Sequence, residues 1–235
     1  MSFLARFPIG IILLLVISVL IYFGIAQRVL DRLRLSDKAA LGVIAAIIVG
    51  GFINIPLPGK PRIEASLNVG GGLVPLLLSG YLFLEAGTVK EKVRAIAGIL
   101  FTAGAIYLTG FFLGAEPETM FLDPLYVYPV VGGVVAYIIG RSRRSAFIAA
   151  TVGILLVDVV MYFWLLFTGR PGAVLIGGGG AFDAVVIGGL LAVLLAEFIG
   201  ETREFLQGGP EARGKAKLLL KQLRPIHRKE EEDNE

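Results

Sequence analysis

The sequence predicts an all-α membrane protein, a bundle of about seven transmembrane helices whose third and seventh members are interrupted by runs of glycine. Two observations predict the bundle: 56% of the 235 residues are hydrophobic, and the charged 17% gather in short clusters between long apolar stretches. A helix needs about 20 mostly apolar residues to cross a bilayer, and several stretches approach that length. The third observation is that two glycine clusters, residues 70–72 and 177–180, lie inside apolar stretches.

Seven apolar stretches are candidates for these helices: residues 8–25, 39–57, 67–84, 94–113, 125–140, 146–168 and 173–199. The first is predicted to be a retained helix, because the basic cluster that follows it would face the wrong side after cleavage of a signal sequence. The fifth is short at its outer end, where Asp123 and Pro124 precede it. The seventh is long enough to tilt or to contain a break.

The distribution of Lys and Arg predicts the orientation of the helices. Eighteen of the 22 basic residues follow the first, third, fifth and seventh stretches. Because basic residues are retained in the cytoplasm, we expect a multipass protein of the cell membrane with its N-terminus outside and its C-terminus inside. Residues 1–200 would then form the transmembrane helical domain, and residues 201–235 a cytoplasmic tail that is amphipathic and charged.

The composition also excludes several kinds of site. The chain has no cysteine, and its single histidine, His227, lies in the tail. Neither a thiolate metal site nor a histidine cluster in the membrane is therefore expected, and the prediction is that the protein holds no metal and no cofactor. The net charge of +3 follows from the topology and gives no reason to expect binding to nucleic acid. Membrane lipid is the expected partner, and an oligomer is compatible with the sequence.

Two aspartates stand inside the last two apolar stretches. Asp158 and Asp183 lie at equal sequence distance from the Arg170-Pro171 turn, so a membrane hairpin would place both carboxyls at one depth. We expect their Cβ atoms to lie within roughly 10 Å of each other. A carboxylate at bilayer depth costs about 2.5 kcal/mol or more, which makes a functional pair the first interpretation. The alternative is that each is a buried acid satisfied by Tyr107, Thr151, Asn54 or Asn68.

The glycine clusters predict breaks at which the backbone is available to a ligand. Asn68 precedes the first cluster and Asp183 follows the second. Backbone groups freed at such breaks bind substrates or ions in membrane proteins. The predicted substrate- or ion-binding residues are Asn54, Asn68, Gly70, Gly71, Gly178, Gly179 and Gly180. The two segments also align weakly, with Leu67 opposite Leu175, which either an internal duplication or composition bias explains.

Several of these motifs together resemble an uncharacterised family of prokaryotic membrane proteins, domain of unknown function 1614. The resemblance is carried by residues 53–56, 67–71 with Pro75, 153–158 and 178–183, and the glycine-to-aspartate stretch is its most specific part. It covers most of the chain from the second apolar stretch onward. The family implies a membrane protein and no particular activity.

A looser resemblance is to the intramembrane aspartyl proteases of the presenilin and signal peptide peptidase kind. Those proteases carry one aspartate on the sixth span and one on the seventh, the second after a Gly-x-Gly motif, as Asp158 and Asp183 would lie here. The resemblance implies that Asp158 and Asp183 are catalytic and share one proton, with a transmembrane peptide as substrate. Two alternatives remain open from the residues: a transporter or channel in which the pair binds a proton or sodium ion, and a membrane scaffold without turnover.

Overall fold

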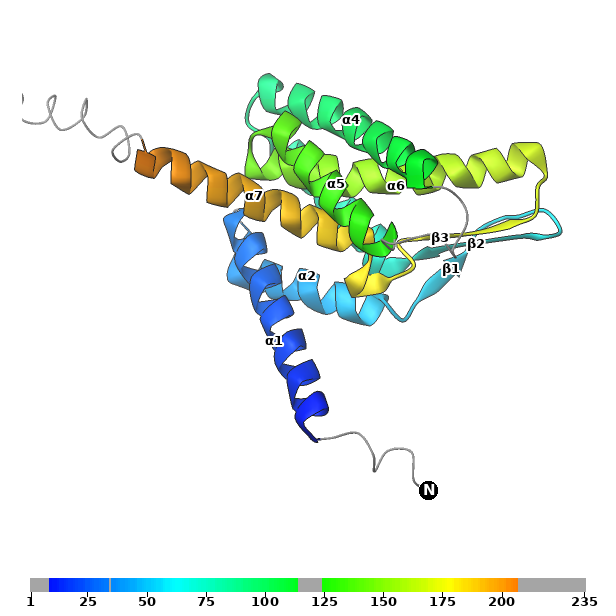
Figure 1. Ribbon diagram of the computed structural model, residues 1–235, viewed down its shortest axis with the longest axis horizontal. Coiled ribbons are helices and arrows are strands. Elements are labelled where there is room, and N and C mark those ends of the chain that lie inside the picture. The colour runs from blue at the N-terminus through cyan, green and yellow to red at the C-terminus, as the bar shows by residue number, and fades with distance from the viewer. Residues whose placement is uncertain (1–8, 34, 114–123, 207–235) are drawn as a thin grey trace, which may run out of the picture. The chain divides into compact units, whose positions relative to one another are not determined.

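The computed structural model describes residues 9–33, 35–113 and 124–206 (Figure 1). The prediction of a mostly helical chain is confirmed. Its α-helices are α1 (Ile9–Arg32), α2 (Asp37–Gly50), α3 (Val74–Leu84), α4 (Val89–Leu113), α5 (Pro124–Gly140), α6 (Arg143–Thr168) and α7 (Ala184–Leu206). The chain divides into two compact units, Met1–Ala196 and Glu197–Glu235, and the candidate site lies in the first. Most of the predicted tail, residues 207–235, lies outside the described part of the chain.

Two helices of the described residues are long and apolar enough to cross a membrane. They are Val89–Phe112 and Arg143–Thr168, which correspond to the predicted fourth and sixth spans. Shorter apolar helices cover Val69–Leu84, Val127–Gly140 and Ala184–Gly200. By length and composition, two membrane-length helices are therefore present, and α6 is the longer of them.

The prediction of an all-α fold is wrong, because three segments form a sheet. These are β1 (Asn54–Pro56), β2 (Ile63–Asn68) and β3 (Gly172–Ile176), in the order β1-β2-β3. The β1–β2 pair is antiparallel and the β2–β3 pair is parallel. The predicted second span is consequently not a single helix, and the third and seventh, which were predicted to be interrupted, each begin in a strand. Hydropathy alone does not separate a buried strand from a helix, and here the strands pair their backbone polar groups with one another.

The sheet turns one face to α6, as Figure 1 shows for the C-terminal half of that helix. Burial alternates along β3, with Val174 and Ile176 buried and Leu175 exposed. The buried side chains pack into one cluster with Tyr162 and Leu165 of α6. This period of two is what a strand with one covered face requires, and it fixes β3 along the helix that precedes it.

Small residues allow α6 to lie close to its neighbouring helices. A Cβ atom at Gly98 of α4 would be 2.6 Å from Cβ of Ala149, and one at Gly189 of α7 would be 2.7 Å from Oγ1 of Thr151. A cluster of fully buried alanines joins α5, α6 and α7: Ala136, Ala146, Ala149, Ala150 and Ala192. Contacts of this kind bring backbones together without large side chains, the packing mode of helices in membranes.

Candidate functional site

The two glycine clusters meet each other at a junction of three backbone segments. The first cluster forms a π-helical turn, η2 (Val69–Leu73), and the second forms the turn before a short 3-10 helix, η4 (Gly180–Phe182). A Cβ atom at Gly71 would lie 2.2 Å from the carbonyl oxygen of Gly177, and one at Gly70 would lie 2.1 Å from that of Ile47 at the end of α2. No side chain fits at either position, so these glycines allow backbone to pack on backbone.

The predicted ligand residues of this region divide into packed and accessible ones. Gly70, Gly71 and Gly180 are buried in the junction, whereas Gly178 and Gly179 are exposed. A Cβ atom at Gly177, which has a φ of +67°, would lie 2.2 Å from the amide nitrogen of Gly72. Gly177 was not among the predicted site residues, although the four-glycine run contains it.

The two predicted asparagines bind each other across β1 and β2. Asn68 is 1% exposed, and its Nδ2 donates to the Oδ1 of Asn54 and to the carbonyl oxygen of Gly51, each at 2.9 Å. Its Oδ1 accepts a hydrogen bond from the amide of Gly71 at 2.8 Å. Asn68 therefore caps the π-helical turn with its oxygen and ties β1 to α2 with its nitrogen.

Asp183 is the N-cap of α7. Its backbone is extended, with φ −66° and ψ 150°. One carboxylate oxygen accepts from the amide of Val185 and the other from the amide of Gly179, each at 2.9 Å. The Asp183 carbonyl oxygen accepts the first helical hydrogen bond, from Ile187. A carboxylate at this position stabilises the helix both by capping its amides and by its charge at the positive end of the dipole.

Asp158 reaches the same level because a strand rises faster than a helix. From Asp158 to the end of α6 at Thr168 the chain climbs about 15 Å, at 1.5 Å per residue. The five residues of β3 return about 16 Å, at 3.3 Å per residue. The return therefore ends at Gly177, whose amide is directed at the Asp158 carboxyl group, and this group interacts electrostatically with Asp183.

Two tyrosines complete the site, and the sequence reasoning missed both. Tyr128 of α5 interacts electrostatically with Asp158, and Tyr22 of α1 does so with Asp183. Two of the predicted alternative partners of the acids have other surroundings. Tyr107 is 67% exposed. Thr151 is fully buried, with no hydrogen-bond partner for its hydroxyl. A tyrosine inside an apolar span is the only sequence signal that marks these positions, and Tyr22 and Tyr128 share it with others.

The site thus gathers two half-buried carboxyl groups, backbone amides and two phenols. Among the described residues, no group of three or more His, Cys, Asp or Glu side chains could hold a metal ion. Asp158 interacts electrostatically with Asp183. Two interacting carboxyl groups do not ionise independently, so such a pair favours a bound proton or cation.

The fold and the site define a largely helical protein with membrane-length helices and a pair of interacting aspartates. The chain belongs to the family described as "Protein of unknown function (DUF1614)", whose sequence profile matches residues 34–195. No curated protein and no solved structure matches the chain. The resemblance to intramembrane aspartyl proteases has no support from these comparisons, whereas the resemblance to the DUF1614 family is confirmed.

Proposed function

We propose that this is an integral membrane protein in which Asp158 and Asp183 bind a proton or a monovalent cation, as in a coupled transporter or a channel. The observation that carries the proposal is the composition of the site. The two carboxyl groups interact with each other, with backbone amides and with two tyrosines, all of them neutral apart from the acids themselves. A bound cation or proton supplies the positive counter-charge that none of these partners provides.

The backbone around the pair suits this role. Asp183 is held by two amide hydrogen bonds and stands at the start of α7, so its position is fixed. Asp158 comes from the middle of α6, a helix long and apolar enough to span a membrane. Interrupted apolar segments, whose helix N-termini and freed backbone groups meet at one site, are a recurrent design of ion-coupled carriers.

An aspartyl hydrolase acting on a transmembrane peptide is the second candidate. The observation that favours it is β3, an extended segment that leads directly to the glycine turn beside Asp158. In that mechanism one carboxyl group would act as the acid and the other would activate water.

The proposed topology places the N-terminus outside the cell and the C-terminus in the cytoplasm. The two residues that test this topology lie near opposite ends of α6. Lys60 donates to the carbonyl oxygen of Leu166 near the C-terminal end, and Arg143 begins the helix about 35 Å away along its axis. A cysteine at Lys60 should be labelled from outside by an impermeant reagent, and one at Arg143 should not. The natural chain has no cysteine, so labelling has no background. The opposite pattern inverts the topology.

Flux in proteoliposomes distinguishes the functional classes. Sodium- or proton-driven flux should be lost in Asp158→Asn and in Asp183→Asn, because an amide cannot exchange a proton or balance a cation. Glu64→Gln is the matched control, since Glu64 is an exposed acid on β2. Cleavage of a co-expressed single-span substrate that both Asn variants abolish, without any flux, supports the hydrolase instead. Two silent Asn variants indicate a structural pair.

A further inference from the structure

The first helix presents one packed face to the rest of the unit. Ala26, Val29 and Leu30 of α1, with Leu33 directly after it, are almost fully buried and join the core cluster that contains Phe147 and Leu190. These residues recur at the spacing of one helix face. Tyr22, four residues before Ala26, continues that face at its outer end, where the cluster meets η4.

Tyr22 is tied to the turn that carries Asp183. Its hydroxyl donates to the carbonyl oxygen of Ala181 at 2.5 Å, and its ring lies against that of Phe182 with centroids 5.0 Å apart. Ala181 and Phe182 belong to η4, and Asp183 is its C-cap. The chain from Gly179 to Asp183 is a tight turn in which Phe182 donates to Gly179 and Asp183 donates to Gly180. A contact at Ala181 therefore acts on the whole turn.

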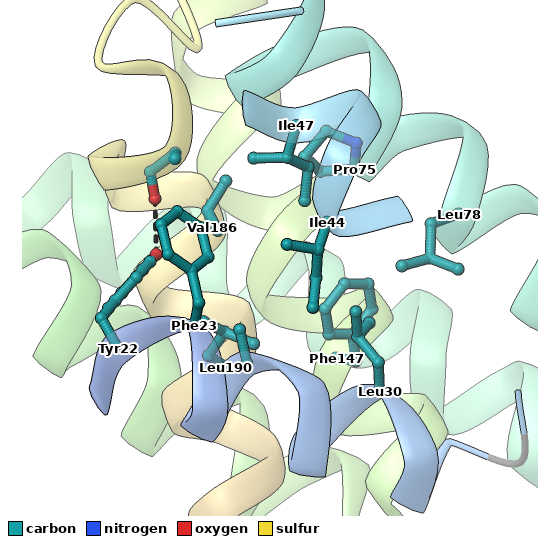
Figure 2. Close-up of a pocket in the computed structure, with 12 residues that line it drawn as sticks. Tyr22, Phe23, Leu30, Ile44, Ile47, Pro75, Leu78, Phe147, Val186 and Leu190 are labelled. Carbon is teal, nitrogen blue, oxygen red and sulfur yellow. Dashed lines mark hydrogen bonds between the residues drawn. The ribbon is translucent and has the colours of Figure 1, made fainter. Parts of the chain in front are cut away.

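Apart from Tyr22 itself, the cavity that Tyr22 lines is formed by apolar side chains. Figure 2 shows Tyr22 at one end of a small cavity between α1 and the helices behind it. Tyr22 is the only one of the twelve lining residues with a polar side chain, and its neighbours there include Phe23, Ile47 and Leu190. The Ala181 carbonyl supplies the hydrogen bond that a tyrosine hydroxyl needs in such apolar surroundings.

We propose that Tyr22 is a positioning residue for the aspartate site: through Ala181 it fixes the turn from which Asp183 projects, and so makes α1 part of that site. The proposal rests on the proposed cation-binding role of the aspartate pair. Both aspartates lie within the family match at residues 34–195, whereas Tyr22 precedes it. The site thus depends on an element that the family match does not include.

Tyr22→Phe tests this inference, because it removes the hydroxyl and keeps the ring against Phe182. Tyr81→Phe is the matched control, since Tyr81 is 50% exposed on α3. In nanodiscs, hydrogen exchange of the Gly179 and Val185 amides, which bind the Asp183 carboxylate, should accelerate about fivefold in Tyr22→Phe and remain unchanged in Tyr81→Phe. In proteoliposomes, the half-saturating cation concentration should rise about fivefold while the maximal flux is retained.

The two measurements separate this inference from the proposed function. Faster exchange confined to the turn, in a protein whose wild type shows no flux, supports the positioning role and overturns the cation-binding role. Unchanged exchange at Gly179 and Val185 overturns the positioning role, whatever the flux. Exchange that rises throughout the unit overturns it as well, because Tyr22 would then be a general packing residue.

Discussion

The two junctions between strand and helix have one plan and different chemistry. In the first, β2 passes through the glycines of η2 into α3, and Asn68 caps the turn. In the second, β3 passes through four glycines and η4 into α7, and Asp183 caps the helix. The strands that lead into them lie side by side in parallel, with Leu67 opposite Ile176. Both junctions thus present a helix N-terminus, with its capping oxygen, at one place in the fold.

The two junctions differ in the further role of the capping side chain. Asn68 is buried, and both its oxygen and its nitrogen bind the protein. Asp183 is half-buried, has an ionisable carboxyl group where an amide would also cap, and interacts with Asp158. An asparagine caps a helix as well as an aspartate does. The comparison teaches that the first junction is built for packing, and that the charge at the second is a feature which packing does not explain.

The largest expected effect comes from breaking the backbone contact that joins the two junctions. In Gly71→Ala the new Cβ would lie 2.2 Å and 2.8 Å from the carbonyl oxygens of Gly177 and Gly180. Backbone cannot rotate away as a side chain can, so we expect a loss of about 3 kcal/mol or more in unfolding free energy. Gly80→Ala is the control, because nothing lies within 4 Å of that position, and it should be neutral or stabilising. Thermal unfolding in detergent measures both.

A charge introduced at the first junction should be nearly as harmful. Asn68→Asp replaces a nitrogen that donates to Asn54 and Gly51 with an oxygen that faces two acceptors. A buried carboxylate without a partner should lower the unfolding free energy by about 3 kcal/mol. Asn54→Asp is the matched control, since it keeps the accepting oxygen on an exposed residue. Equal stability of the two variants would show that the first junction tolerates charge.

The converse exchange at the second junction should affect stability much less. Asp183→Asn keeps a capping oxygen for one of the two amides, so the unfolding free energy should change by less than about 1 kcal/mol. Asp183→Ala removes both bonds and should cost about 1–2 kcal/mol. Flux should be lost in both variants. Retained flux in Asp183→Asn would place the second junction in the same structural class as the first.

The smallest expected effect is the coupling between the two aspartates. In a double-mutant cycle of Asp158→Asn and Asp183→Asn, the first substitution removes the repulsion between the carboxyl groups. The second substitution therefore raises the unfolding free energy by less than it does alone. We expect a coupling energy of about 0.5–1 kcal/mol in unfolding free energy, and a smaller value at high salt. A coupling of zero would mean that the carboxyl groups do not sense each other.

Much of the helical framework was predictable from the sequence. The fourth and sixth apolar stretches are the two membrane-length helices, and Ser142 and Gly169 mark the ends of the latter with an N-cap hydroxyl and a left-handed C-cap. The weak alignment of the two glycine segments sets Leu67 against Leu175 and predicted no strand pairing, whereas in the sheet Leu67 lies opposite Ile176, one residue further. That single residue decides which face is covered: Leu175 is exposed, whereas Ile176 is buried.

The sequence by itself determined which residues are costly to bury, Asp158 and Asp183. It also determined where the backbone must have no side chain, in the two glycine clusters. These depend on composition and local order, and burial cost and steric limits apply to them in any fold. Only the tertiary structure decided that residues 172–176 return as a strand, because hydropathy is the same for strand and helix and long-range pairing selects between them. The same pairing sets Asp158 beside Gly177, and the packing of α1 brings Tyr22 to Ala181, across a separation in sequence that no local pattern encodes.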